Sequence, residues 1–183
     1  DNNIQAFERA VSSDPVSYFG GIIGFNTKVS ADLAEKLIEP FLECIVAPEF
    51  SKESLEVFSK KKNLRLIKIS ENFKLSETMI KNALGGYLLQ DRDQLDFDIS
   101  KCEIATNKAP TKIEMSALSL GWKLVKYVKS NAIVFSNNNQ LLSVGAGQMS
   151  RVDSVKNAIR KISETGLSLN GAVMASDAFF PFP

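Results

Sequence analysis

Apolar and polar residues alternate along the chain in a way that predicts helices and strands in turn. In the first part, apolar residues at helical spacing predict helices, and short apolar runs bounded by Gly or Pro predict strands. The expected helices cover 2–12, 30–39 and 51–62, and the expected strands cover 20–25, 43–47 and 64–69. The lysines at 60–62 then fall in a last helical turn, where cations suit the helix dipole.

The second part carries clearer start and stop signals. Thr111 and Glu114 have the spacing of a capping box, which predicts a helix that buries Ile113, Ala117, Leu118, Leu124, Val125 and Val128. Gly121 lies in the middle of that helix, which suggests close packing there. A hairpin is expected over 132–144 with its turn at 137–140, then a helix from Ser150 to Gly166 and a strand over 171–175.

The middle of the chain is less regular. Residues 85–90 and 102–105 are expected to be short strands, and 91–98 an acidic loop. The stretch 107–110 is the best candidate for a boundary, which divides the chain into a first lobe, 1–109, and the start of a second, 110–183. Together the elements predict a layered α/β fold with mostly parallel strands and one hairpin.

Composition excludes several functional classes. The 183 residues are 44% hydrophobic and 23% charged, and the net charge of +1 gives no field for nucleic acid or an anionic membrane. No apolar run could span a bilayer, and two widely separated cysteines favour a reducing, cytoplasmic setting. The absence of histidine argues against a metal site and excludes a Ser-His-Asp triad.

The two ends suggest that the chain is a piece of a longer protein. It starts with Asp1 in place of Met, inside a helical pattern, and three aromatic residues crowd its last five positions. So much apolar surface at a terminus normally packs against something.

Four segments could carry chemistry, and each also has a plain structural reading. SNAIV at 130–134 and GAGQMSRV at 145–152 place polar or glycine-rich turns beside buried strands, where α/β folds bind ligands. ASDAFFPF at 175–182 and DPVSYFGGII at 14–23 combine aromatic and polar residues that could contact a flat heterocycle. Alternatively, the first two are ordinary turns, 175–182 is core that has lost its covering chain, and 14–23 is a turn with aromatic packing.

These four strings, with IVAP at 45–48 and GGYLLQD at 85–91, together resemble one family, in the family's own order. It is the bifunctional purine synthesis family that combines aminoimidazole carboxamide ribonucleotide formyltransferase with inosinate cyclohydrolase. The resemblance implies formyl transfer from 10-formyltetrahydrofolate to the 5-amino group of that ribonucleotide. It also implies a cytidine-deaminase-like fold without zinc and a homodimer whose sites form across the subunit interface.

The resemblance also assigns site residues. Asn131 matches the family's asparagine near the reacting amine, and Phe19, Gly20, Glu43 and Phe179 match residues around the substrate heterocycle. The folate cleft would be lined by Arg151, Val152, Pro181 and Phe182.

The family's catalytic Lys-His pair has no counterpart in this sequence, so we expect the isolated chain to be inactive. A non-catalytic module that binds a nucleotide or a partner chain stays open as the alternative.

Overall fold

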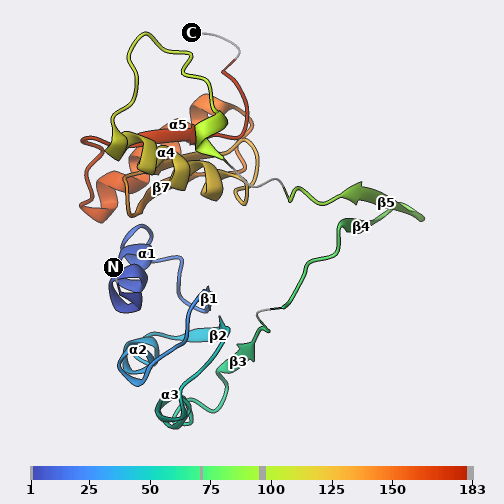
Figure 1. Cartoon of the computed structure of the whole chain (residues 1–183), viewed down its shortest axis with the longest axis vertical. Helices are drawn as coiled ribbons and strands as arrows, with labels where there is room; N and C mark the ends of the chain where they lie inside the picture. Colours follow the sequence, from blue (N-terminus) through green and yellow to red (C-terminus); the bar gives the residue numbers. More distant parts are fainter. Residues whose placement is uncertain (1, 71, 95–97, 181–183) are drawn as a thin grey trace.

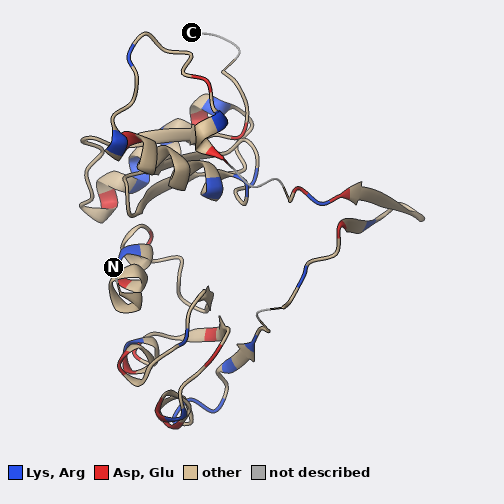
Figure 2. Ribbon diagram, viewed as in Figure 1, with Lys and Arg blue, Asp and Glu red and all other residues tan. Residues whose placement is uncertain are grey.

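The computed structural model describes residues 2–70, 72–94 and 98–180, which form two lobes and a projecting arm (Figure 1). The first lobe contains three helices and three strands. These are α1 (Asn3–Ser12), β1 (Gly21–Gly24), α2 (Ala31–Leu37), β2 (Leu42–Ala47), α3 (Lys52–Phe58) and β3 (Arg65–Lys68). Lys, Arg, Asp and Glu are intermixed along both lobes (Figure 2).

The first lobe is a parallel sheet with helices packed on one face. Its strand order is β1-β2-β3, and Ile23, Ile45 and Leu66 lie in register across it. These three residues pack in one apolar cluster with α2 and α3. Ile22 points to the opposite face, because neighbouring strand residues alternate, and it is 71% exposed. In the described part of the chain, that face is exposed at Ile22 and Ile67, whereas Cys44 beside Ile22 is buried.

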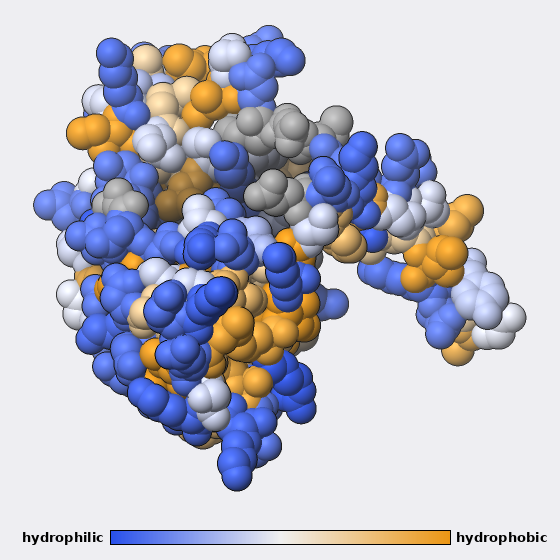
Figure 3. Space-filling model, turned by 60° about the horizontal axis from the view of Figure 1, so that its bottom comes forward, coloured by the Kyte–Doolittle hydropathy of each residue, from blue (hydrophilic) through white to orange (hydrophobic). Residues whose placement is uncertain are grey.

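The arm, residues 78–91, is an isolated antiparallel hairpin. It consists of β4 (Thr78–Ala83) and β5 (Gly86–Asp91), joined by a turn in which Leu84 and Gly85 have positive φ. Every residue of β5 is exposed, and apolar surface covers much of the arm and part of the first lobe (Figure 3). Two strands alone are marginally stable in water, so the arm is an element that would gain from a covering partner.

The second lobe has three layers, with an antiparallel sheet between two helices. Its elements are η1 (Ile99–Lys101), α4 (Lys112–Val125), β6 (Ile133–Ser136), β7 (Leu141–Gly145), α5 (Arg151–Thr165) and β8 (Val173–Ser176). The strand order is β7-β6-β8. Ser136 donates to the Ala117 carbonyl of α4 and Ser143 to the Ala158 carbonyl of α5, so the two helices lie on opposite faces of the sheet.

Two glycines permit the close approach of these helices. A Cβ on Gly145 would lie 1.8 Å from the Ser154 carbonyl oxygen of α5. A Cβ on Gly121 would lie 2.8 Å from Ser136 Oγ, so the close packing suggested by the sequence is confirmed. The helix-to-sheet distance in this lobe is therefore set by positions without a side chain.

Helix α1 connects the two lobes. Gln140 Nε2, in the hairpin turn of the second lobe, donates to Ser12 Oγ at 2.7 Å and to the Arg9 carbonyl at 3.1 Å. Just beyond the helix, Asp14 forms an ion pair of 2.9 Å with Lys161 of α5. The partners are more than 120 positions apart in sequence, so these contacts are long-range tertiary contacts.

The structure confirms the α/β class and much of the element order. The capping box of Thr111 and Glu114 is present, and Gly166 ends α5 with a φ of 72°. The expected hairpin over 132–144 is confirmed as β6–β7. The pairing is parallel in the first lobe, as expected.

Several predictions about single elements were wrong. Among the described strands, those of the first sheet pair in parallel and the others pair antiparallel. The arm is a second hairpin, whose first strand the sequence did not reveal because it has no one-sided apolar pattern. Helix α3 ends at Phe58, so the three lysines follow it, and 102–105 is not a strand. Ile113, expected in the core, is 67% exposed. The lobe boundary at 109/110 and the deaminase-like topology stay predictions.

Candidate active site

Asn131 lies just before the central strand of the second lobe's sheet, in the turn that leads from α4 into β6. Its side-chain amide donates to the carbonyls of Gln148 and Met149 at 2.9 and 3.2 Å. Its Oδ1 accepts from Arg151 Nη2 at 3.0 Å. Two segments that the sequence separated by about twenty positions therefore meet directly at this side chain.

The glycine-rich turn between β7 and α5 holds these carbonyls in place. Gly147 has a φ of 67°, a region that L-residues with a side chain rarely adopt, and its N–H donates to the Lys129 carbonyl at 2.8 Å. Ser150 then caps α5 by accepting from the Asp153 N–H at 3.1 Å. The turn therefore presents carbonyl oxygens to Asn131.

Arg151, the first residue of α5, is the centre of the hydrogen-bond network. Its side chain is only 10% exposed, and Nη1 donates to Ser176 Oγ at 2.9 Å and forms a short ion pair with Asp177. The Phe180 ring lies beside the guanidinium, 5.9 Å from its carbon to the ring centroid. An anionic ligand at Arg151 would therefore share the cation with a carboxylate of the protein.

Asp177 is a member of the site to which the sequence analysis assigned no role. Its Oδ1 accepts from the Ala132 N–H at 3.0 Å, which ties the end of β8 to the start of β6. Burial by itself would raise the pKa of this carboxyl, but hydrogen bonds from Ser130 and Arg151 lower the pKa to about 2. Asp177 is therefore a fixed negative charge at neutral pH. A charged residue directly after a buried strand was the available signal.

The aromatic residues after β8 are placed unequally. Phe180 contacts Arg151, whereas Phe179, the expected substrate contact, is 81% exposed. Val152 is 53% exposed on the first turn of α5. The two remaining expected residues, Pro181 and Phe182, lie outside the described residues.

The other expected substrate residues lie in the first lobe. Phe19 is 74% exposed and packs on Phe41 with ring centroids 5.0 Å apart, and the Gly20 N–H donates to the Phe41 carbonyl at 2.9 Å. Glu43 is paired with Arg65 at 3.6 Å. Among the described residues, no hydrogen bond or ion pair joins these residues to Asn131. The structure thus assembles Asn131 with Arg151, and a single cleft shared with the first lobe stays a prediction.

Within the described residues, no group of three or more Cys, Asp or Glu side chains is arranged to hold a metal ion. Both cysteines have free thiols; Cys44 is buried and Cys102 is exposed. No helix in the described part of the chain is long and apolar enough to cross a membrane.

Comparison with known proteins relates this geometry to a family. Residues 1–161 match the family model described as AICARFT/IMPCHase bienzyme. The chain is 44% identical over all of its 183 residues to the bifunctional purine biosynthesis protein PurH of Thermoanaerobacter sp., and covers 35% of that protein. Proteins of the same name from Aquifex aeolicus and Bacillus cytotoxicus are each 48% identical over 97% and 98% of the chain, which covers 34% and 35% of their lengths. The chain thus spans about a third of the length of these relatives, and it belongs to the AICARFT/IMPCHase bienzyme family.

Proposed function

We propose that this chain is part of the formyltransferase of a bifunctional purine biosynthesis enzyme. The reaction moves the formyl group of 10-formyltetrahydrofolate to the 5-amino group of aminoimidazole carboxamide ribonucleotide. The observation that supports the proposal most directly is the match of the family model to residues 1–161, which contain Asn131 and Arg151. The same match disfavours the alternative of a non-catalytic binding module.

The hydrogen bonds of Asn131 define what its side chain can do. Both amide hydrogens are used by the carbonyls of Gln148 and Met149, whereas Oδ1 accepts one hydrogen bond from Arg151 and keeps a second lone pair. In this state Asn131 can accept a hydrogen bond from an amine N–H and orient its nitrogen. It cannot take up a proton at neutral pH, so it acts by positioning the amine.

The reaction needs more than positioning. The substrate amine is an arylamine whose lone pair is delocalised into the ring, so attack on the formyl carbon requires removal of a proton and stabilisation of an oxyanion. This sequence contains no histidine for the first task. We therefore propose that a general base comes from a part of the enzyme outside this chain, and that the chain alone transfers no measurable formyl group.

Folate recognition would use Arg151 and the exposed apolar side chains beside it. Exposed Val152 and Phe179 offer apolar surface for a flat heterocycle, and Arg151 offers one cation beside it. Because Arg151 is already paired with Asp177, its contribution to an anionic co-substrate would be weaker than that of a free arginine.

The proposed assembly is a cytoplasmic homodimer. Phe19 and Ile22 of the first lobe are 74% and 71% exposed, and exposed apolar side chains of this kind favour association. The free thiols of Cys44 and Cys102 agree with a reducing compartment. Sedimentation equilibrium of the chain would test the dimer, and a clean monomer at high concentration would contradict it.

A chimera tests the catalytic proposal. The corresponding segment of the Aquifex aeolicus relative would be replaced by this chain, and formyl transfer would be followed by release of tetrahydrofolate. We expect an active chimera, and we expect Asn131→Ala to lower kcat roughly 100-fold, the effect of removing one positioned polar group. Asn139→Ala in the hairpin turn is the matched control and should retain activity. An inactive chimera that binds the ribonucleotide, or full activity of the Asn131 variant, would contradict the proposal.

A further inference from the structure

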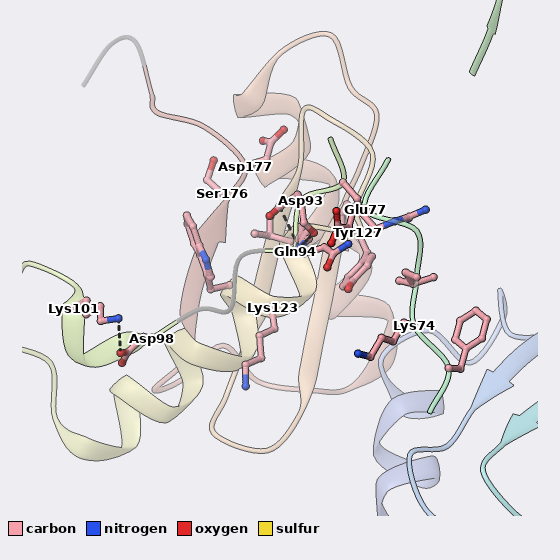
Figure 4. Close-up of a pocket in the computed structure, with 17 residues that line it drawn as sticks. Lys74, Glu77, Asp93, Gln94, Asp98, Lys101, Lys123, Tyr127, Ser176 and Asp177 are labelled. Atoms are coloured by element: carbon pink, nitrogen blue, oxygen red, sulfur yellow. Dashed lines mark hydrogen bonds and ion pairs between the residues drawn. The ribbon is translucent and has the colours of Figure 1, made fainter. Parts of the chain in front are cut away.

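Asp177 contacts both sequence neighbours of Asn131 from the end of β8, where Figure 4 shows it beside Ser176. Its Oδ1 accepts from the Ala132 N–H at 3.0 Å, and its own N–H donates to the Ala132 carbonyl at 3.3 Å. The Ser130 hydroxyl donates to the same carboxylate. Asp177 therefore holds the backbone on either side of Asn131.

The same carboxylate also fixes the guanidinium that reaches Asn131. Nη1 of Arg151 pairs with Asp177, and Nη2 donates to Asn131 Oδ1 at 3.0 Å. The guanidinium is planar and rigid, so a contact that holds one of its nitrogens also sets the direction of the other. Ser176 Oγ accepts from Nη1 at 2.9 Å and limits rotation further. Asp177 thus acts on the side chain of Asn131 through Arg151, in addition to its contacts with the backbone.

The side-chain amide of Asn131 has one favourable orientation in this network. Its Nδ2 donates to the carbonyls of Gln148 and Met149, while its Oδ1 accepts from Arg151. Turning the amide over would place Oδ1 against the two carbonyl oxygens and the amide hydrogens against the guanidinium, so every one of these hydrogen bonds would become a repulsive contact. The orientation of the amide therefore depends on Arg151 as well as on the backbone carbonyls.

Arg151 in turn depends on the charge of Asp177. The Arg151 side chain is only 10% exposed, and a cation with so little access to water is stable when a charged partner lies beside it. If the carboxylate were replaced by a neutral group, the guanidinium would gain free energy by turning towards water or towards an external anion. Asn131 Oδ1 would then lose the donor that fixes it.

We propose that Asp177 is a positioning residue for formyl transfer, which fixes Arg151 and thereby the Asn131 oxygen that accepts from the substrate amine. The inference rests on the proposed function, because it assumes that Asn131 orients this amine. Arg151 also offers a cation to the anionic folate, and that cation is kept when Asp177 loses its charge. Loss of the charge should therefore disturb the orientation of the amine without weakening the attraction of the folate.

The positioning can be measured in the chain itself, without catalysis. NMR spectra of the isotope-labelled chain give the rate at which the side-chain amide hydrogens of Asn131 exchange with water, and Asn131→Ala identifies their signals by loss. Asp177→Asn should raise this rate at least about threefold, because an amide held on one side only opens more often. Glu164→Gln removes a carboxylate paired with Arg160 on the same helix as Arg151 and should leave the rate unchanged. An unchanged rate in Asp177→Asn would overturn the inference.

The kinetic test uses the chimera with the Aquifex aeolicus relative. Asp177→Asn should lower kcat about tenfold, as expected when a group that contacts the reacting atoms is misplaced, and should not raise KM for 10-formyltetrahydrofolate. Glu164→Gln should keep the kcat and KM of the parent chimera. A raised KM with unchanged kcat would show that Asp177 serves folate binding, which contradicts the inference. A parent chimera that binds the ribonucleotide but is inactive would contradict the proposed function instead, and the exchange measurement would still decide whether Asp177 holds the amide.

A double variant separates positioning from a general loss of stability. In the Asn131→Ala background no amide is left to position, so adding Asp177→Asn should lower kcat by less than about a further twofold. A merely structural role would cost the same factor in both backgrounds, and that result would refute the inference. Asp177→Glu keeps the negative charge on a longer side chain and provides the same comparison where Asp177→Asn folds poorly. Its loss of kcat should also disappear in the Asn131→Ala background.

Discussion

The ion pair between Arg151 and Asp177 should contribute strongly to the stability of the second lobe. Asp177→Asn keeps the size of the side chain and its Oδ1 acceptor for the Ala132 N–H, but removes the charge opposite Arg151. The side chains of Arg151 and Asp177 are 10% and 21% exposed. Exposed pairs contribute up to about 1 kcal/mol, and loss of one partner of a buried pair costs about 3–5 kcal/mol. For this partly buried pair we expect a loss of about 2 kcal/mol in the free energy of unfolding at pH 7.

The pH dependence of this loss follows from the lowered pKa. The folded-state pKa of Asp177 is about 2, and the ordinary value is 3.8. The contribution of the carboxylate to the free energy of unfolding is therefore complete above about pH 5, and it falls as the pH drops from there towards the folded-state pKa. By pH 3, about half of the contribution attributable to the lowered pKa should be lost, since the unfolded chain is by then largely protonated at this position. The difference between wild type and variant should therefore narrow on acidification.

Urea unfolding followed by Trp122 fluorescence measures both quantities. The matched control is Glu164→Gln, which removes an exposed pair with Arg160 on the same helix as Arg151 and should lower stability by less than about 0.5 kcal/mol. If Asp177→Asn is as mild as the control at pH 7, or if its deficit is the same at pH 5 and pH 3, the reasoning about this network is wrong.

Three further predictions concern the packing of the lobes. Gly145→Ala places a methyl group against the α5 backbone and should lower stability by about 3 kcal/mol in thermal or urea unfolding. Gly24→Ala is the control and should be nearly neutral, because no atom lies within 4 Å of the added Cβ. Equal effects of the two substitutions would refute the steric argument. Thr111→Ala removes the cap of α4 and should lower stability by about 1 kcal/mol in urea unfolding, and an unchanged midpoint would contradict it. Gln140→Ala removes two hydrogen bonds to α1 and should speed amide exchange in residues 3–12 without affecting α5. Exchange in α1 as slow as in the wild type would show that these bonds are dispensable.

Local signals in the sequence predicted the elements whose boundaries depend on local chemistry. Thr111 with Glu114, Ser150 and Gly166 act on hydrogen bonds within a few residues, and each was found where it was expected. Such features can be predicted from the sequence because each hydrogen-bond partner lies at a fixed spacing along the chain.

Features set by distant partners were not predictable in the same way. The arm is exposed on both faces, so β4 lacks the alternation that identifies a half-buried strand. Ile113 is at helical spacing with the core, but α4 buries its face through Ala117, Gly121 and Val125. The pairing of Arg151 with Asp177 joins residues 26 positions apart, and no spacing rule specifies it. Asn131 and Arg151 were named by family resemblance, and their direct hydrogen bond appeared only in three dimensions.

The attachment of α1 to the second lobe has a consequence for the order in which the chain folds. The parallel sheet of the first lobe and helices α2 and α3 lie within residues 21–68, so they can form while later residues are still being synthesised. The contacts of α1 with Gln140 and of Asp14 with Lys161 cannot form until more than 120 further residues have been added. During synthesis the first helix can already pack on the core of the first lobe and pair Asn3 with Thr27 and Lys28, whereas its attachment to the second lobe forms among the last contacts of the fold.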